Sequence, residues 1–270
     1  MAKPLLPDDL WAKVEPLLPP PKPRRFRFPG RKPVDNRKAL TGILFVLKTG
    51  IPWEDLPKEM GCGSGMTCWR RLRDWHHAGV WDALLEILLA ELNHAGRIDW
   101  SRASIDGTLT RALGGVEGSG PNPTDRGRPG VKHHVVVDGH GTPLVIDRTA
   151  ANVADITHLP TMMASIPPVR GRTGCPRRRP AKLYADRGYD SEELRAKLRG
   201  QGIEPVIAKR RTEHGSGLGI YRWVVERAIA WLHGFRKLRL VTEKTEDMQY
   251  AFLNLAHVII LWRVLKPSLC

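Results

Sequence analysis

The chain has 270 residues, of which 41% are hydrophobic, and a formal net charge of +15. This length predicts one large domain or two smaller ones with a real core, and the charge predicts a polyanionic partner. Nucleic acid is favoured over a membrane surface, because no segment combines a basic helical face with a clean apolar one and no apolar run approaches the roughly 18 residues that cross a bilayer.

Residues 1–98 are predicted to form a small all-helical domain. A first short helix is expected from Asp8 or Asp9 to Leu18, and the acidic residue at its start would cap it. The segment 19–33 is rich in proline and arginine, which favours a linker over regular structure. The N-terminus lacks the apolar core of a signal peptide, so we expect a cytoplasmic protein.

Two helices with cap signals at their ends follow the linker. Asp35 or Asn36 is expected to open an apolar helix that ends at Gly50, and Ser64 is expected to cap a basic helix that ends at Gly79. The second of these helices carries Arg70, Arg71 and Arg73. A Gly-containing connection and a basic second helix indicate a helix-turn-helix that binds DNA through these arginines.

Two alternatives remain for this region. The basic helix could belong to an ordinary small bundle, which a further helix over about Trp81–Asn93 would complete. Cys62, Cys68, His76 and His77 could hold zinc, although their spacing fits no familiar zinc motif and free thiols are favoured.

The pattern changes to strands after the helical region, so a second domain is expected over 99–270. The stretch "RASIDGT" is predicted to be a short strand with Asp106 near its end. Two further strands are expected around the turn Asp138–Gly141, which is a strong hairpin signal. The segment 151–166 is expected to be helical, and Asp155 at its start is either an acid near the site or a helix cap.

Strands and helices then alternate to the end of the chain. We expect a strand at Leu183–Ala185, a helix over Ser191–Arg199, a strand at Pro205–Ala208, a helix around Glu226 and an apolar helix from about Glu246. A hairpin-linked group of strands followed by this alternation predicts an α/β fold, a mixed sheet covered by helices.

Two aspartates stand at predicted strand ends, where sites form in α/β sheets. Asp106 follows one buried strand and Asp186 follows another. A lone aspartate at such a place is commonly a turn or helix cap. Two on neighbouring strands are unfavourable together unless a cation neutralises them, and oxygen donors suit Mg²⁺ or Mn²⁺.

A third acid stands in a basic, tryptophan-rich helix. At helical spacing Glu226 shares a stripe with Arg222, His233 and Lys237. The ordinary explanation is a solvated face on which Glu226 pairs with Arg222 and Arg227.

The segments "SIDGT", "LYADRGYDS" and "RWVVERAIAWLHGFRKLR", in this order, resemble the DDE transposases of bacterial insertion sequences, in the insertion-sequence-five family. The resemblance implies a ribonuclease-H-like second domain in which Asp106, Asp186 and Glu226 bind two Mg²⁺ or Mn²⁺ ions and are catalytic. The family signature around the glutamate is Tyr-x2-Arg-x3-Glu-x6-Lys. Here Tyr221 directly precedes the arginine, and His233 stands in place of the lysine.

The resemblance also implies the function. We expect a transposase that binds the terminal inverted repeats of its element, cuts DNA and transfers strands, acting as a homodimer or higher oligomer on double-stranded DNA near the bacterial nucleoid. The expected DNA contacts beyond the N-terminal arginines are Lys132, Arg222, His233 and Lys237. The alternatives are a catalytically inactive DNA-binding remnant, a domesticated regulator, or a ribonuclease-H-like nuclease.

Overall fold

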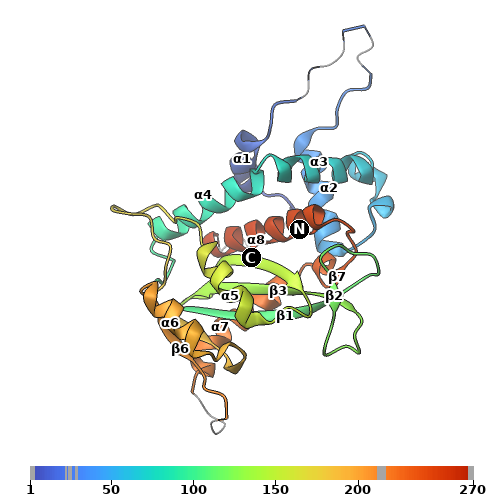
Figure 1. Ribbon diagram of the computed structural model, residues 1–270. Helices are drawn as coiled ribbons and strands as arrows, with labels where there is room; N and C mark the ends of the chain where they lie inside the picture. The colour runs from blue at the N-terminus through green and yellow to red at the C-terminus, as the bar shows by residue number, and fades with distance from the viewer. Residues whose placement is uncertain (1–3, 22, 24–25, 28–29, 212–216, 267–270) are drawn as a thin grey trace.

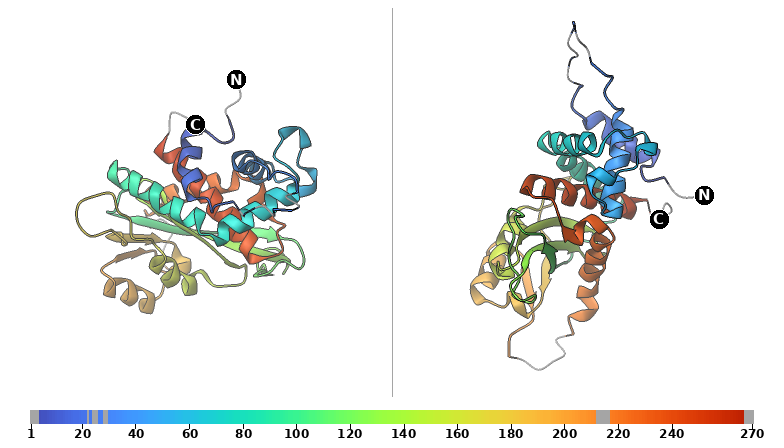
Figure 2. Two further views of the ribbon diagram at one scale, coloured as in Figure 1. Left: turned by 90° about the horizontal axis from the view of Figure 1, so that it is seen from above. Right: turned by 90° about the vertical axis from the view of Figure 1, so that its right-hand side faces the viewer.

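The computed structural model describes residues 4–21, 23, 26–27, 30–211 and 217–266 (Figure 1). A mixed sheet lies at the centre of the molecule, with helices on both of its faces. The N-terminal helices form a further layer, and the last helix, α8 (Glu246–Leu265), lies between them and the sheet (Figure 2).

The N-terminal region is helical, as predicted. Its elements are α1 (Asp8–Val14), η1 (Glu15–Leu17), α2 (Asn36–Thr49), η2 (Trp53–Asp55), η3 (Lys58–Met60), α3 (Gly65–His77) and α4 (Val80–His94). Two of the expected caps are present, since the side chain of Asp35 accepts from Lys38 N and that of Ser64 from Thr67 N. Gly50 ends α2 in the left-handed conformation, at φ 74°. The prediction that Asp8 or Asp9 caps the first helix was wrong, because the N-cap residue of α1 is Pro7 and no side chain caps this helix.

The connection between α2 and α3 is longer than the sequence pattern indicated. A helix-turn-helix joins its helices through three or four residues, whereas fifteen residues (50–64) separate α2 from α3. Pro52 and Pro57 each stand just before a 3₁₀ turn in this connection, η2 and η3. The tight turn instead joins α3 to α4, where Gly79 has a φ of 71°.

The sheet has seven strands: β1 (Ala103–Ala112), β2 (Gly120–Pro121), β3 (Pro129–Asp138), β4 (Pro143–Ala150), β5 (Lys182–Ala185), β6 (Glu204–Ile207) and β7 (Leu240–Val241). β3 pairs antiparallel with both β1 and β4, while β5 pairs parallel with β1 and β6. The predicted hairpin is confirmed at Asp138, whose carboxylate accepts from the N–H groups of Asp99, His140 and Thr142. This mixed sheet confirms the predicted fold class.

One edge of β1 is interrupted, and this interruption positions the site. β3 pairs along β1 from Ala103 to Arg111. On the other edge, β5 pairs only with Ala103 and Ser104, and β7 pairs only with Arg111 and Ala112. Within the described chain, residues 105–110 therefore have no strand partner on that edge. We call this gap between β5 and β7 the β1 notch.

The remaining helical elements are α5 (Asp155–Ala164), η4 (Arg187–Tyr189), α6 (Glu192–Gly200), α7 (Gly219–His233), η5 (Arg236–Leu238) and α8. α7 packs on one face of β1 and β3, and α8 continues that layer over β4. In the described part of the chain α8 is the one helix long and apolar enough to cross a membrane, with a mean hydropathy of 1.3. Because 72% of that stretch is buried, α8 is accounted for as a core helix.

One large hydrophobic core runs from the N-terminal helices into the sheet, and a second, small cluster lies at Ala112, Val116, Val131 and Val241. The large core includes Leu40 and Leu88 from α2 and α4, Leu255 from α8 and Ile105 from β1. α8 thus joins the two halves of the chain through one continuous packing layer. The domain boundary expected near residue 98 falls just before β1 and stays a prediction.

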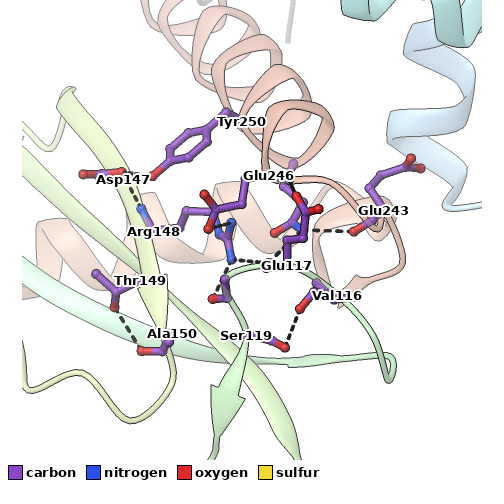
Figure 3. Close-up of polar contacts among 12 residues, drawn as sticks. Val116, Glu117, Ser119, Asp147, Arg148, Thr149, Ala150, Glu243, Glu246 and Tyr250 are labelled. Atoms are coloured by element: carbon purple, nitrogen blue, oxygen red, sulfur yellow. Dashed lines mark hydrogen bonds and ion pairs between the residues drawn. The ribbon is translucent and has the colours of Figure 1, made fainter.

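A buried arginine ties the loop after β1 to the start of α8 (Figure 3). Arg148 of β4 donates to the carbonyls of Glu117 and Gly118 at 3.2 and 2.9 Å, and it pairs with Glu246 at 3.4 Å. The Glu117 carboxylate in turn accepts from the backbone N–H of Glu246. Burial lowers the pKa of Arg148, while the charge of Glu246 raises it.

Replacing this arginine tests the contact. Arg148→Met leaves two carbonyls without their donor, and we expect a loss of about 2–3 kcal/mol in the free energy of unfolding, measured in urea. The exposed Glu246 adds little to that loss. The control is Arg128→Met, which breaks an exposed pair with Asp125 at 3.9 Å and is expected to cost less than about 0.5 kcal/mol. Equal losses in both variants would contradict this role for Arg148.

Candidate active site

Asp106 lies inside β1, not near its end. It is the fourth of ten residues in the strand. Ala103 and Ser104 pair with Leu183 and Tyr184, and continuing this register by two residues brings Asp106 level with Asp186, which directly follows β5. The strand extends beyond the predicted end because β3 supports it up to Arg111. The two aspartates therefore meet where β5 stops and the β1 notch begins.

The carboxylate of Asp106 is held by two donors. Its Oδ1 accepts from the N–H of Gly107 at 2.8 Å, and its Oδ2 accepts from Arg222 of α7 at 3.1 Å. Burial raises the pKa of Asp106, and the charges of Asp186 and Glu226 raise it further, while the Gly107 N–H and Arg222 oppose them. The charges of the two other predicted acids thus both act on Asp106.

Asp186 caps the turn that follows β5, as an isolated aspartate at a strand end commonly does. Its Oδ1 accepts from the N–H of Gly188 at 2.8 Å and caps η4. The neighbouring Asp190 is committed elsewhere, to Arg195 and to the backbone of Arg210. Within the described residues the second oxygen of Asp186 makes no hydrogen bond, so one carboxylate oxygen remains available at the notch.

Glu226 does not make the ordinary helix-surface pairs. Its side chain is exposed, and no ion pair forms to it in the part of the chain that the structure describes. Arg222 turns to Asp106 instead. Arg227 stacks between the rings of Trp223 and Trp231, 4.7 and 4.9 Å from their centroids. Among the described residues, the acid at the centre of the basic stripe is therefore left without a cation.

The donor set fits a hard divalent cation, because all three acids offer carboxylate oxygens. As the side chains stand, no three His, Cys, Asp or Glu groups among the described residues are arranged to hold an ion together. Carboxylates that lie near one another repel unless a cation balances their charge. In this structure the cation at Asp106 is the guanidinium of Arg222. The acids share the notch, but their expected convergence into a ligand set is not present in this arrangement.

Lys132 lies on the opposite face of β1 from Arg222. Only 11% of its side chain is exposed. Its ammonium donates to the carbonyl of Val153 and pairs with Asp155, both at 3.0 Å. Asp155 does not cap α5, whose N-cap residue, Ala154, makes no side-chain hydrogen bond. The predicted phosphate contact of Lys132 would require these bonds to open.

The far end of the stripe on α7 does not reach the notch. Lys237 belongs to η5, and its side chain is only 5% exposed. It donates to Thr242 and pairs with Glu243, both at 2.8 Å. The helix ends at His233, so the stripe expected to continue to Lys237 is broken there. His233 is half-buried, and burial lowers its pKa. A buried, paired Lys237 has no path to a phosphate in this structure.

The three arginines of α3 have different surroundings. Arg70 is exposed and Arg71 half-buried, whereas Arg73 pairs with Asp74 at 2.8 Å and stacks on Trp69. Cys62 and Cys68 are buried free thiols in the same region. The guanidinium groups of Arg70 and Arg71 are therefore freer to contact a ligand on the surface of α3 than that of Arg73, which is already paired.

One residue at the notch was not predicted. Tyr189, three residues after Asp186, is 2% exposed, and its hydroxyl has no hydrogen-bond partner among the described residues. Burial raises its pKa, and the charges of Asp155, Asp106 and Asp186 raise it further. The sequence signal was the spacing: one 3₁₀ turn after a strand-end acid returns a side chain to the same side.

Comparison with known proteins identifies the family of both parts of the chain. A family model described as "Putative transposase of IS4/5 family" matches residues 6–85, and one described as "Transposase DDE domain" matches residues 99–261. The "Putative transposase for insertion sequence element IS402" of Burkholderia cepacia is 60% identical over 150 residues, 56% of this chain and 71% of that protein.

Two further matches were found. The "Insertion element IS402 uncharacterized 16.2 kDa protein" of Burkholderia cepacia is 65% identical over 123 residues, 46% of this chain and 84% of that protein. The Mos1 strand transfer complex matches with a TM-score of 0.33 and 9% identity over 91% of this chain and 79% of that chain, a likeness too low to carry an argument.

The DDE-domain match covers more than half of the chain and includes the sheet and all three acids. The fold and this match define a DDE transposase, an enzyme of the metal-dependent phosphodiester-transfer class. The chain belongs to the IS4/5 family of insertion-sequence transposases.

The pKa of Asp106 gives a pH test of the site. A folded-state pKa above the ordinary 3.8 means that Asp106 contributes stability below pH 3.8 and loses it as pH rises through the folded-state value. The Asp106→Asn variant cannot titrate at this position, so it does not lose stability in this way, and its amide oxygen still accepts from Arg222. We therefore expect the stability of the variant relative to wild type to increase from acid to neutral pH, measured by urea unfolding without metal. A difference that decreases over this range would contradict the environment described for Asp106.

Proposed function

We propose that this transposase binds the terminal inverted repeats of its own element, cleaves a strand at the element's end and joins the freed 3′-hydroxyl to target DNA. The observations that support this most are that the strand register brings Asp106 level with Asp186 at the β1 notch and that the charges of Asp186 and Glu226 both act on Asp106, in a chain of net charge +15. Double-stranded DNA is the polyanion that this charge and the family both favour. Both reactions would use the same three acids.

Each acid has a distinct part in the proposal. Asp106 is fixed within a paired strand, and Asp186 is fixed by its hydrogen bond to Gly188. Glu226, exposed and unpaired on α7, closes the set. Two Mg²⁺ or Mn²⁺ ions held by these carboxylates would activate the attacking oxygen and stabilise the leaving oxygen.

Arg222 would change partners during this process. In the metal-free protein it neutralises Asp106. Once the charge of Asp106 is balanced otherwise, the guanidinium is released beside the acids, where a scissile phosphate would lie. A planar guanidinium can bind two phosphate oxygens at once, which suits it to hold the DNA strand in place.

The N-terminal helices would read the repeat through α3. Arg70 and Arg71 are its exposed and half-exposed cations. Replacing both with Ala should weaken repeat binding and reduce the slope of log affinity against log salt by about two if each contacts one phosphate. Gel shifts over a salt series measure this slope, and an unchanged slope would assign DNA binding to another surface.

Nicking of a labelled repeat in Mg²⁺ tests the three acids. Asp106→Asn, Asp186→Asn and Glu226→Gln preserve side-chain shape, so folding and repeat binding should survive. Cleavage should fall by at least about a thousandfold, because these groups hold the main electrostatic stabilisation of the reaction. Glu86→Gln, which removes an exposed acid of α4 outside the notch, is the control and should retain cleavage. Wild-type cleavage in any one of the three variants would exclude that residue from the site.

The same assay separates the enzyme from an inactive remnant. A remnant or a domesticated regulator would bind the repeat without cutting it. The mutual proximity of Asp106 and Asp186, and the charge of Glu226 acting on Asp106, favour the enzyme, since a chain that only binds DNA has no use for carboxylates that repel one another.

A further inference from the structure

A concentration of positive charge lies outside both the notch and α3, in the loop that leads into β5. We call residues 169–181 the arginine loop, which projects from the molecule beside α4 (Figure 1). No acid stands in the sequence between Asp155 and Asp186, so the loop has no carboxylate of its own. Its exposed arginines are Arg170, Arg172, Arg177, Arg178 and Arg179.

Hydrogen bonds fix the arginine loop to the rest of the fold. Val169 and Arg177 exchange two backbone hydrogen bonds, at 2.9 and 3.0 Å, which close the loop on itself. Asn93, near the end of α4, donates from its side chain to the carbonyl of Arg170 at 2.7 Å. The carbonyl of Asn93 in turn accepts from Arg172 Nε at 2.9 Å. The backbone of the loop therefore has a defined position, and so do the arginines that it carries.

Two arginines of the loop are free to bind a ligand. Arg172 and Arg179 donate to backbone carbonyls and help to hold the loop in place. The side chains of Arg177 and Arg178 are exposed, and neither makes a hydrogen bond or an ion pair with any residue that the structure describes. With Arg179 and Pro176 they line an open hollow of about 390 Å³. Guanidinium groups that lack a carboxylate suit phosphate, because each offers a planar fork of donors.

The arginine loop lies within one turn of DNA from the candidate active site. Arg177 precedes Asp186 by nine residues. A fully extended chain spans at most about 3.6 Å per residue, which limits the distance between these two residues to about 32 Å. One helical turn of B-DNA is about 34 Å long. A duplex bound at the notch is therefore long enough to reach the loop.

We propose, on the basis of the proposed function, that the arginine loop is a second DNA-binding surface, at which Arg177 and Arg178 bind phosphates of the duplex whatever its sequence. Phosphate contacts position a duplex and carry no sequence information. This division of labour leaves the reading of the repeat to α3. The loop can therefore hold DNA that lacks the repeat, such as the DNA next to the element or the target.

Binding of two labelled duplexes of equal length to the full chain tests the proposal. One duplex carries the repeat and the other a scrambled sequence, and fluorescence anisotropy gives both affinities over a KCl series without Mg²⁺. Arg177→Gln combined with Arg178→Gln should weaken both duplexes by the same factor, about tenfold, and reduce the slope of log affinity against log salt by about two. The ratio of the two affinities should not change. An unchanged slope, or a loss confined to the repeat duplex, would overturn the proposal.

Two control variants separate local contact from net charge and from folding. Lys182→Gln combined with Lys197→Gln removes the same two charges from exposed lysines that glutamates already pair, at 3.0 and 2.7 Å, and should leave the slope nearly unchanged. Arg177→Lys combined with Arg178→Lys keeps both charges and should retain most of the slope. Equal losses in the two glutamine variants would mean that net charge alone attracts DNA, and would reject the loop as a binding surface.

The α3 variant separates this inference from the function on which it rests. Arg70→Ala combined with Arg71→Ala should lower the ratio of repeat to scrambled affinity. If it does so while Arg177→Gln with Arg178→Gln changes neither affinity, recognition of the repeat stands and the arginine loop is rejected. If the wild-type protein binds both duplexes equally, recognition of the repeat is wrong, and the slope of the loop variant still decides whether the loop binds DNA.

Discussion

The arrangement of this protein depends on the repulsion between carboxylates that share one interruption in a sheet. β5 ends at Ala185, just where the parallel register brings Asp106 and Asp186 level, and α7 adds Glu226 from one face. Three negative charges near one interruption, two of them partly buried, are unfavourable together. Arg222 forms an ion pair with Asp106 and partly balances this charge. The pKa of Asp106 nevertheless stays above its ordinary value. A site that carries more negative charge than its own cations balance is prepared for a divalent cation.

The elements around the notch are joined to one another by strand pairing and by helix packing. The notch keeps its shape because β3 supports β1 along its whole pairing edge, and because α7 and α8 cover the sheet in one layer. α8 also carries the N-terminal helices, so the region expected to bind the repeat rests on the scaffold that holds the acids. The contacts of Arg148 fix the start of α8 to β4 and to the loop after β1 (Figure 3). DNA bound at α3 would therefore be held at a defined position relative to the notch.

Much of the fold follows from local signals in the sequence. Ser64, Asp35 and Gly50 mark helix ends by local hydrogen bonding and backbone conformation, and they were predicted because those signals need no tertiary context. The extent of β1 was not predictable locally, since its second half depends on pairing with β3 and β7. Lys237 was misplaced for a similar reason: helical spacing put it on the stripe of Glu226, but α7 ends at His233 and Lys237 turns into a pair with Glu243. The partners of Arg222 and Lys132 likewise come from elements far apart in the chain.

The central claim is that Asp106, Asp186 and Glu226 hold a divalent cation at the β1 notch. Anomalous scattering from crystals of the full chain grown with Mn²⁺ measures this most directly, because it locates the ion without reference to activity. The account predicts an anomalous peak between the carboxylates of Asp106 and Asp186, with Glu226 turned toward it and Arg222 released from Asp106. A peak elsewhere, with the Arg222–Asp106 pair intact, would contradict it.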